Sequence, residues 1–343
     1  MHDYRYQPAV REYYAMLSKE ASDLSFIVAN NEFPVAVCPL TVENIEGRAQ
    51  ASLSGGDFLP LPLFHPKLGP KQLRGLETFI FEEALRRLKS ADARRWLMGA
   101  NPLSAGTDAL EDLLPARLGA LDVSIQCHVM DLTQTDEDLW IQLRHSAKST
   151  INQGLKAYEF KVYDRTSYAP EIGDRHRFLH HKCAGRVTRP QATFEKMYSW
   201  IAEDCGLMFE QLHAGKTVQM IFVALGKDTA YGASAADDPD FQPPVPITHP
   251  MNFFIYKETQ RRGVKYYEVG ETTFRDGLFR PRTRKEKTIC DFKRGFGRQT
   301  LPHKRWIWFE GPKEEIVFLK ERLELYKKHL AEAPELGPKT KCS

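Results

Sequence analysis

The sequence predicts an α/β protein made of two similar units in tandem. The length of 343 residues exceeds what one hydrophobic core usually organises, so two domains are expected. Short β-rich runs alternate with amphipathic helical stretches, which is typical of a mixed α/β fold. The two halves also repeat one order of elements: hairpin strands, a loop, a helix with a basic end, and a short strand that finishes in glycine.

The first predicted domain covers residues 1–132. Two β-rich runs within residues 25–40 are separated by two asparagines, which indicates a hairpin. Apolar residues recur at helical spacing over residues 71–89, and a short strand at 96–99 follows. Residues 123–132 alternate with period two, and we expect this strand to end the domain.

The second predicted domain covers residues 133–300 and contains the catalytic loop described below. Its elements are expected to be a helix at 136–158, a strand at 160–163, helices at 171–183 and 191–204, a three-stranded meander within 207–236, a helix at 247–262 and a strand at 265–270. Residues 301–331 form a terminal strand and helix expected to pack back on the first domain, and 332–343 a loose tail.

Composition excludes several classes of protein. The chain is 42% hydrophobic and 27% charged, as in ordinary globular proteins. Its start has no apolar signal region, and its longest apolar runs are too short to span a bilayer, so a cytoplasmic location is expected. Six cysteines are scattered without paired spacing, which favours reduced thiols over a disulfide framework or a zinc ribbon.

Positive charge is concentrated in one window near the end of the second domain. Residues 275–305 hold eleven lysines or arginines and three acids, while the whole chain carries a net charge of only +3. Within this window, residues 291–298 are expected to be a strand end that breaks into a basic, glycine-punctuated loop. Such a site suits phosphates or a developing oxyanion, although a solvated basic loop would have the same composition.

A series of motifs in a fixed order resembles the FemAB/FemX-type transferases. The resemblance is strongest from about Asp131 to Gln299 and looser in the first half. Its most specific part is a Phe-Lys pair followed by Gly-Phe-Gly. The motifs are Val129-Met130-Asp131-Leu132-Thr133, Leu139-Trp140 with Leu143 and a basic helix to Gly154, Gly232-Ala233-Ser234-Ala235, Arg262-Gly263 with Tyr266-Tyr267-Glu268-Val269-Gly270, and Phe292-Lys293-Arg294-Gly295-Phe296-Gly297.

The resemblance implies two tandem GNAT-like domains, each a mixed, mostly antiparallel sheet flanked by helices. It also implies an N-acyltransferase: family members transfer an aminoacyl group from aminoacyl-tRNA to an amine on a peptidoglycan precursor, while GNAT-type relatives use acyl-CoA. It places the functional Phe-Lys pair at Phe292 and Lys293. The helical arm inserted in some members is absent, because no long heptad run occurs.

Acyl transfer to an amine needs bound reactants, a deprotonated amine and a stabilised oxyanion. We expect Lys293 to stabilise the negative charge. Glu268 and Glu271, at a strand end, are candidates for the base or for acceptor binding, and solvated carboxylates would occupy the same places. Tyr256 is a candidate hydrogen-bond donor in the cleft, although a helix tyrosine is more often a core residue.

Four arginines are candidate substrate contacts. Arg186 and Arg189 lie in a turn between helices and are spaced to reach one anionic group, such as an acceptor diphosphate; ordinary helix-end charges would look the same. Arg294 and Arg298 are candidate donor contacts or solvated charges. The expected partners are therefore an acyl donor, either tRNA or CoA, and an anionic acceptor that bears an amine, such as a UDP-linked or lipid-linked precursor.

No metal or permanently bound cofactor is expected. His176, His180, His181 and Cys183 are close in sequence, but no fourth ligand follows at suitable spacing, and nothing local supports Cys183 as a nucleophile.

The donor stays open between aminoacyl-tRNA and acyl-CoA. The GNAT pyrophosphate signature is not cleanly present, which favours a donor other than CoA. One alternative is an acyl-CoA-dependent N-acetyltransferase of a nucleotide amino sugar or small amine. A second is a non-catalytic RNA-binding protein on the same fold.

Overall fold

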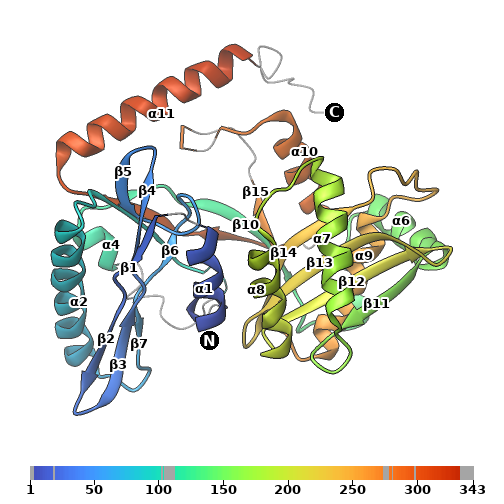
Figure 1. Cartoon of the computed structure of the whole chain (residues 1–343), viewed down its shortest axis with the longest axis horizontal. Helices are drawn as coiled ribbons and strands as arrows, with labels where there is room; N and C mark the ends of the chain where they lie inside the picture. The colour runs from blue at the N-terminus through green and yellow to red at the C-terminus, as the bar shows by residue number, and fades with distance from the viewer. Residues whose placement is uncertain are drawn as a thin grey trace.

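The computed structural model describes residues 4–17, 20–101, 103, 113–272, 278–279, 281–296 and 299–332. Two lobes lie side by side, each built on a seven-stranded sheet, and a smaller three-stranded sheet extends the first lobe (Figure 1). The sequence prediction of an α/β chain with two tandem mixed-sheet units is confirmed.

The first lobe has strand order β1-β4-β5-β8-β17-β9, with β6 beside β8, and a separate sheet β2-β3-β7. Helix α2 (Pro70–Ser90) packs on this lobe through Ile80, Ala84 and Leu88, which recur on one helical face. The remaining elements of this lobe are β1 (Ala21–Asp23), β2 (Phe26–Asn30), β3 (Phe33–Cys38), β4 (Thr41–Ile45), β5 (Arg48–Ala51), β6 (Leu59–Pro60), β7 (Leu63–Phe64), β8 (Arg95–Gly99), α4 (Leu113–Arg117), β9 (Leu121–Asp122) and β17 (Arg305–Phe309).

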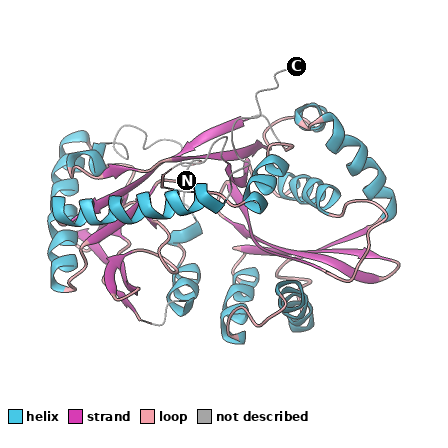
Figure 2. Ribbon diagram, turned by 90° about the horizontal axis from the view of Figure 1, so that it is seen from above, coloured by secondary structure: helices cyan, strands magenta, loops and turns pink. Residues whose placement is uncertain are grey.

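The second lobe has strand order β11-β12-β13-β14-β15-β10-β16, and helices cover both faces of this sheet (Figure 2). Alternate residues of its central strands point to opposite cores, as the period-two geometry of a strand requires. Its elements are β10 (Ile125–Asp131), α5 (Asp136–Gln142), α6 (His145–Ala157), β11 (Glu159–Tyr163), α7 (Pro170–Ala184), α8 (Gln191–Ala202), β12 (Gly206–His213), β13 (Lys216–Leu225), β14 (Thr229–Asp237), α9 (Thr248–Arg261), β15 (Tyr266–Thr272), α10 (Arg284–Lys293) and β16 (Gln299–His303).

The chain crosses between the lobes more often than a boundary at residue 132 implies. Strand β10, expected to end the first domain, lies instead in the second sheet, between β15 and β16. Strand β17 lies in the first sheet, where it pairs with β8 and β9. The alternating pattern at 123–132 predicts a strand, but only pairing in the folded chain decides which sheet that strand joins.

The N-terminal segment also crosses to the second lobe. Helix α1 (Pro8–Leu17) packs on α8, and its Ala9, Val10 and Tyr13 belong to the same buried cluster as Phe194 and Trp200. The short 3-10 helix η1 (Tyr4–Tyr6) precedes α1. The first residues therefore help to fix the relative position of the lobes.

Strands β14 and β15 pair in parallel over only three residues, and this short pairing positions the candidate site. The pairs run from Thr229 with Tyr266 to Tyr231 with Glu268, after which no further pairing of these two strands occurs in the described chain. A bulge in β13–β14 pairing and another in β10–β15 pairing follow near the same level. The two strands thus diverge with backbone and side chains facing a gap between the lobes.

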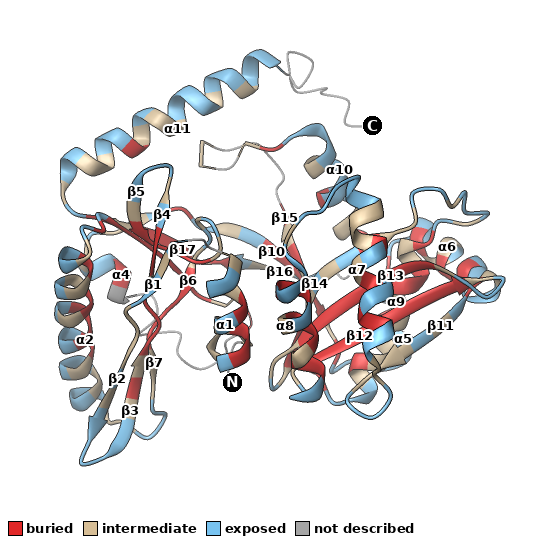
Figure 3. Cartoon of the chain, viewed as in Figure 1, coloured by how far each residue is buried: buried red, intermediate tan, exposed pale blue. Residues whose placement is uncertain are grey.

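The last helix, α11 (Pro312–Glu332), lies along the first lobe, and its outer surface is exposed over most of its length (Figure 3). Phe318 is its buried residue, and an ion pair of 2.6 Å between Arg95 Nε and Glu314 Oε1 ties it to β8. None of the helices in the described ranges combines the length and the apolarity that a membrane crossing requires.

Close packing of α6 on α9 gives a test of this arrangement. A Cβ at Gly154 would lie 2.4 Å from Pro250 Cγ, so Gly154→Ala must push the helices apart. We expect a loss of about 1–3 kcal/mol in unfolding free energy, measured by urea denaturation. Gly75→Ala is the matched control: it lies within α2 with nothing within 4 Å, and should be neutral or stabilise by up to about 1 kcal/mol. Equal effects of the two changes would contradict the packing.

Candidate functional site

Lys293 is the last residue of helix α10, not part of a strand-end loop. The helix begins at a capping box, in which Thr283 Oγ1 accepts from the Glu286 amide and the Glu286 carboxylate accepts from Thr283. It ends in a turn at Arg294, and the buried Phe296 follows. The expectation of a strand was wrong because the density of charge masked the capping box, which is the sequence signal for this helix.

The ammonium of Lys293 occupies space left by a glycine in β15. Lys293 Nζ donates to the Glu271 carbonyl oxygen at 3.4 Å. Gly270 has φ +110°, and a Cβ built on it would lie 2.6 Å from Lys293 Nζ. A side chain at position 270 would therefore meet both backbone strain and the lysine. Because β15 bulges here and α10 ends beside it, the Lys293 ammonium lies at the point where β14 and β15 diverge.

This cation borders a cavity of ≈ 310 Å³ between the lobes. The wall combines four basic side chains with three carboxylates, so charge is dense but of mixed sign. Contributions come from η1 and α1, from the first lobe, and from β14, β15, α10 and β17. The lining residues are Tyr4, Arg5, Tyr14, Leu53, Asp57, Asn101, Tyr231, Glu268, Gly270, Glu271, Arg282, Lys293, His303 and Arg305.

Glu271 holds two arginines at the floor of this cavity. Its Oε2 accepts from Arg282 Nη2 at 2.9 Å, and its Oε1 accepts from Arg305 Nη2 at 2.5 Å. Both guanidiniums are almost fully buried, and Arg305 belongs to β17 of the first sheet. Buried charge requires this kind of pairing, so the carboxylate acts as a link between lobes directly beside the lysine.

Glu268 is half-buried in the cavity wall, at the last parallel pair with Tyr231. Cys127 lies behind it in β10 and is 0% exposed. Burial, and next the charge of Glu268, raise the pKa of the Cys127 thiol well above its ordinary value. The thiol therefore stays protonated, which is unfavourable for a nucleophile because the thiolate is the reactive form.

Three tyrosines also line this cavity. Tyr4 and Tyr231 stack with ring centroids 6.0 Å apart and planes 10° apart. Burial raises the pKa of Tyr14 to about 12, and burial followed by the nearby Glu268 also raises the pKa of Tyr231. The Tyr14 and Tyr231 hydroxyls therefore remain protonated near neutral pH and can donate hydrogen bonds. The N-terminal segment that contains Tyr4 and Tyr14 has no sequence motif that would predict their place in this cavity.

Phe292 and Tyr256 support the site from the core rather than line it. The Phe292 ring contacts His249 and Phe296 at centroid distances of 4.8 and 5.1 Å, which fixes α10 on the second lobe. Tyr256 is 1% exposed and packs edge-on against Tyr267 at 4.8 Å. The proposed role of Tyr256 as a donor in the cleft is corrected: its helix turns it inward to the apolar cluster under α9.

The four candidate arginines are not gathered at the cavity. Arg186 is exposed after α7, and Arg189 lies over the Phe194 ring at 3.9 Å with a hydrogen bond to Tyr13, so the pair does not form an anion site with Lys293. Arg189 instead joins α1 to α8, because its guanidinium packs against the aromatic rings of Tyr13 and Phe194. Arg294 pairs with Asp291, one turn before it, and Arg298 lies outside the described residues.

The histidine group of α7 is a packing cluster. Nδ1 of buried His176 lies 2.8 Å from the Tyr198 hydroxyl. No group of three or more His, Cys, Asp or Glu residues within the described ranges has the geometry of a metal site. Burial, and then the charges of His180 and Arg189, lower the pKa of His176 to about 3.

The arrangement of strands and helices also occurs in proteins of known structure. No protein-family model and no curated protein matches the chain. Among solved structures, FemX superposes with a TM-score of 0.67 over 90% of this chain and 92% of its own, at 13% identity. The chain has the fold of FemX.

Two further structures share this FemX fold. L-PGS from Bacillus licheniformis superposes with a TM-score of 0.60 over 91% of each chain, at 10% identity. The C-terminal domain of a putative lysylphosphatidylglycerol synthetase from Agrobacterium fabrum does so with a TM-score of 0.55 over 94% of this chain and 96% of its own, at 11% identity. The fold expected from the motif order is thus confirmed across nearly the whole chain.

The site contains residues that sequence reasoning did not single out. Gly270 was noted only as the end of a strand, and Arg282 and Arg305 only as charges in a basic window. Tyr231 immediately precedes the Gly-Ala-Ser-Ala motif, which was a usable signal for it. Tyr4 and Tyr14 reach the cavity through long-range packing of the N-terminus, for which the sequence carries no local signal.

The low pKa of His176 predicts an acid dependence of stability. The unfolded chain takes up a proton near pH 6.5 that the folded chain resists until about pH 3, so stability present above pH 6.5 is lost as pH falls between these values. This one group contributes up to about 1.4 kcal/mol per pH unit. His176→Gln should flatten that part of the curve in urea denaturation at several pH values. The same slope in His176→Gln and wild type would contradict the assignment.

The contact of Lys293 with Gly270 predicts a difference between two glycine substitutions. Gly263→Ala adds a methyl at φ +82° with nothing within 4 Å, and should cost about 1 kcal/mol of stability. Gly270→Ala adds comparable backbone strain and also displaces Lys293, so we expect a further loss of about 1–3 kcal/mol. Denaturant unfolding measures both. If Gly270→Ala were no more destabilised than Gly263→Ala, the lysine would not fill that space.

Proposed function

We propose that the chain is an N-acyltransferase that transfers an acyl or aminoacyl group to an amine, with Lys293 stabilising the negative charge of the transition state. The observation that carries the proposal is the Lys293 ammonium set against Gly270 at the edge of a cavity between the lobes. A preorganised cation is most effective where water is largely excluded and little reorganisation is needed. The hydrogen bond to the Glu271 carbonyl oxygen supplies that order.

Glu268 is the proposed base. The acceptor nitrogen attacks the carbonyl carbon of the donor ester or thioester, and a C–N bond forms as the carbonyl oxygen gains negative charge beside Lys293. The proton leaves the nitrogen for the Glu268 carboxylate. The C–O or C–S bond then breaks, and the departing oxygen or sulfur takes up that proton. Support comes from the position of Glu268 in the same cavity wall as Lys293.

Direct attack is preferred to a covalent thioester intermediate. Cys127 lies beside Glu268 of the cavity wall, but its thiol is fully buried and its pKa is raised. The Cys290 thiol, which donates to the Glu271 carbonyl oxygen, is buried as well. Forming a thiolate at Cys127 would place a second negative charge beside a carboxylate in a dry environment. Both reactants are therefore proposed to occupy the cavity together.

The preferred donor is an aminoacyl-tRNA rather than acyl-CoA. The segment between β14 and α9, residues 238–247, contains four prolines and no glycine, and its Asp238 and Asp240 pair with Lys182. This chemistry is unfavourable for a pyrophosphate at the start of α9. In the first lobe, the amides of Gly55 and Gly56 already donate to the buried Glu43 carboxylate. These observations support a donor without a pyrophosphate bound in either place.

The acceptor is proposed to be an anionic, amine-bearing precursor of the cell envelope or a related sugar or peptide. The shared fold with FemX motivates this class, and the basic side chains of the cavity suit an anionic molecule. The reaction is expected to take place in the cytoplasm, where charged tRNA is available.

Replacing Lys293 separates catalysis from binding. Lys293→Ala should lower the single-turnover transfer rate by about 10²–10³-fold, because one preorganised oxyanion partner is lost. Filter binding of charged tRNA should change little. Lys285→Ala, on the exposed face of the same helix, is the matched control and should retain activity. Candidate amines and both donor classes, charged tRNA and acetyl-CoA, are supplied in parallel.

Three outcomes would contradict this function. Full activity in Lys293→Ala would remove the lysine from the mechanism. Transfer from acetyl-CoA alone would replace the tRNA donor. Tight RNA binding by the wild type, without transfer to any amine offered, would favour a non-catalytic RNA-binding protein on the same fold.

A further inference from the structure

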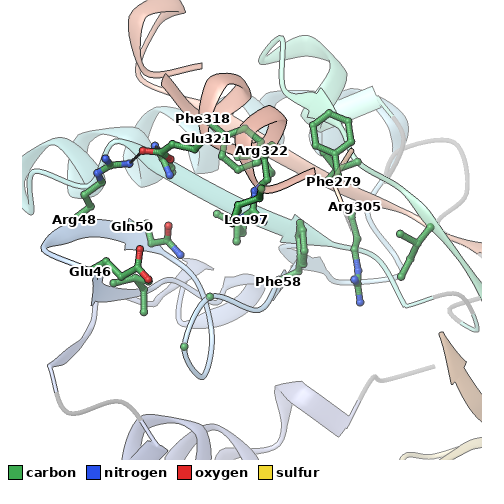
Figure 4. A pocket seen from close by; sticks show the side chains of 18 residues that line it. Glu46, Arg48, Gln50, Phe58, Leu97, Phe279, Arg305, Phe318, Glu321 and Arg322 are labelled. Carbon is green, nitrogen blue, oxygen red and sulfur yellow. Dashed lines mark hydrogen bonds and ion pairs between the residues drawn. The ribbon is translucent and has the colours of Figure 1, made fainter. Parts of the chain in front are cut away.

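A second and larger cavity lies in the first lobe beneath helix α11. Its volume is ≈ 610 Å³, within the range of small-molecule sites. Figure 4 shows Phe318 and Arg322 of α11 above it, and Leu97 of β8 and Phe58 below. Arg305 also borders the cavity, so the same guanidinium lies between this cavity and the one that contains Lys293.

Arg322 borders this cavity and forms no close ion pair within the described residues. Its guanidinium lies 5.1 Å from the centroid of the Phe318 ring, and within the described residues no carboxylate is in ion-pair distance of it. Burial, and then the neighbouring Arg95, lower the pKa of Arg322, while the charges of Glu321 and Glu46 oppose this shift in part. The guanidinium is therefore only partly compensated, and a bound anion would stabilise it.

Two other arginines in the wall retain unused donors. Arg305 is 5% exposed, and its Nε has no hydrogen-bond partner among the described residues, although its Nη2 is bound to Glu271. Arg95 is also buried; its Nε donates to Glu314, and its Nη2 lies 3.6 Å from Glu321 Oε2, in an ion pair but with no hydrogen bond in the described chain. Buried donors are normally satisfied, so these atoms mark a place where a polar group of another molecule fits.

Much of the remaining wall is apolar. Leu97, Val123 and Ile307 form the sheet side, and Phe58, Phe318 and Leu325 face it. The wall also contains two carboxylates, Glu46 and Glu321, and Glu321 forms ion pairs with Arg48 and Arg95. An inorganic anion alone would leave the apolar surface against water. A ligand that joins an apolar group to an anion would use both parts of the wall.

We propose that the cavity beneath α11 binds an amphiphilic anion, an apolar group carrying a phosphate, with the phosphate at Arg322 and the apolar part against Leu97 and Phe318. A phosphate fits because its several oxygens accept from more than one guanidinium at once. This proposal rests on the residues that line the cavity and does not depend on the proposed transfer reaction. Because Arg305 borders both cavities, a molecule held here would lie next to the Lys293 site.

Isothermal titration calorimetry on the full chain tests the proposal with three probes below their micelle concentrations. Octyl phosphate carries both features, inorganic phosphate carries only the charge, and octyl glucoside carries the chain without charge. We expect saturable one-to-one binding of octyl phosphate, at least tenfold tighter than binding of either of the others. Absence of such binding, or equal affinity for octyl glucoside, would overturn the proposal, and tight binding of phosphate alone would reduce the site to a simple anion site.

Two pairs of variants locate the binding. Arg322→Gln should weaken octyl phosphate binding by about tenfold or more, while Lys328→Gln on exposed α11 should leave it unchanged. Leu325→Glu places a carboxylate at the mouth of the cavity and should abolish binding, whereas Leu323→Glu is matched in exposure but lies outside the lining. Leu325 and Leu323 are 51% and 43% exposed, so both variants should fold. Equal effects within either pair would place the ligand elsewhere.

Discussion

The Glu271 carboxylate is the constraint on which the rest of the site depends. It binds Arg282, which precedes α10, and Arg305, which belongs to a strand of the other lobe. Its backbone carbonyl oxygen accepts from Lys293. One residue therefore fixes the relative position of the lobes, the start of the lysine helix and the lysine itself. Removing the carboxylate would leave the buried Arg305 guanidinium without its ion-pair partner and Arg282 with the more distant Glu286 at 3.7 Å, which is strongly destabilising.

Short-range patterns predicted most of the elements and the fold class. The helical spacing over 71–89 corresponds to α2, and the meander within 207–236 to β12, β13 and β14. The exchange of β10 and β17 between sheets was not predictable in full, because strand periodicity does not specify a partner. The sequence predicted a strand end and a loop where helix α10 lies. Thr283 and Glu286 form a capping box, which is a signal for the start of this helix, but the high charge of the segment favoured a loop.

The site was predictable only where a motif marked it. Lys293, Glu268 and Glu271 come together in one cavity, whereas Arg186, Arg189 and Tyr256 do not join them. A helix residue such as Tyr256 faces the core or the cleft according to the helix rotation, and spacing alone does not give that rotation relative to a cavity. Tyr4 of η1 and Tyr14 of α1 reach the cavity because α1 packs on α8, a long-range contact that local sequence does not predict. The need for glycine at position 270 follows only from the structure, in which the Lys293 side chain occupies the space that a Cβ would take.

Chemical restoration of the lysine tests the central claim most directly. Lys293→Cys removes the ammonium, and alkylation with 2-bromoethylamine rebuilds a side chain of nearly the same length and charge. Wild type treated in the same way controls for modification of other cysteines, including exposed Cys183. We predict that unmodified Lys293→Cys transfers acyl groups about 10²–10³-fold more slowly than wild type and that alkylation restores most of the rate. An unmodified variant as active as wild type would contradict a role for this cation in the reaction.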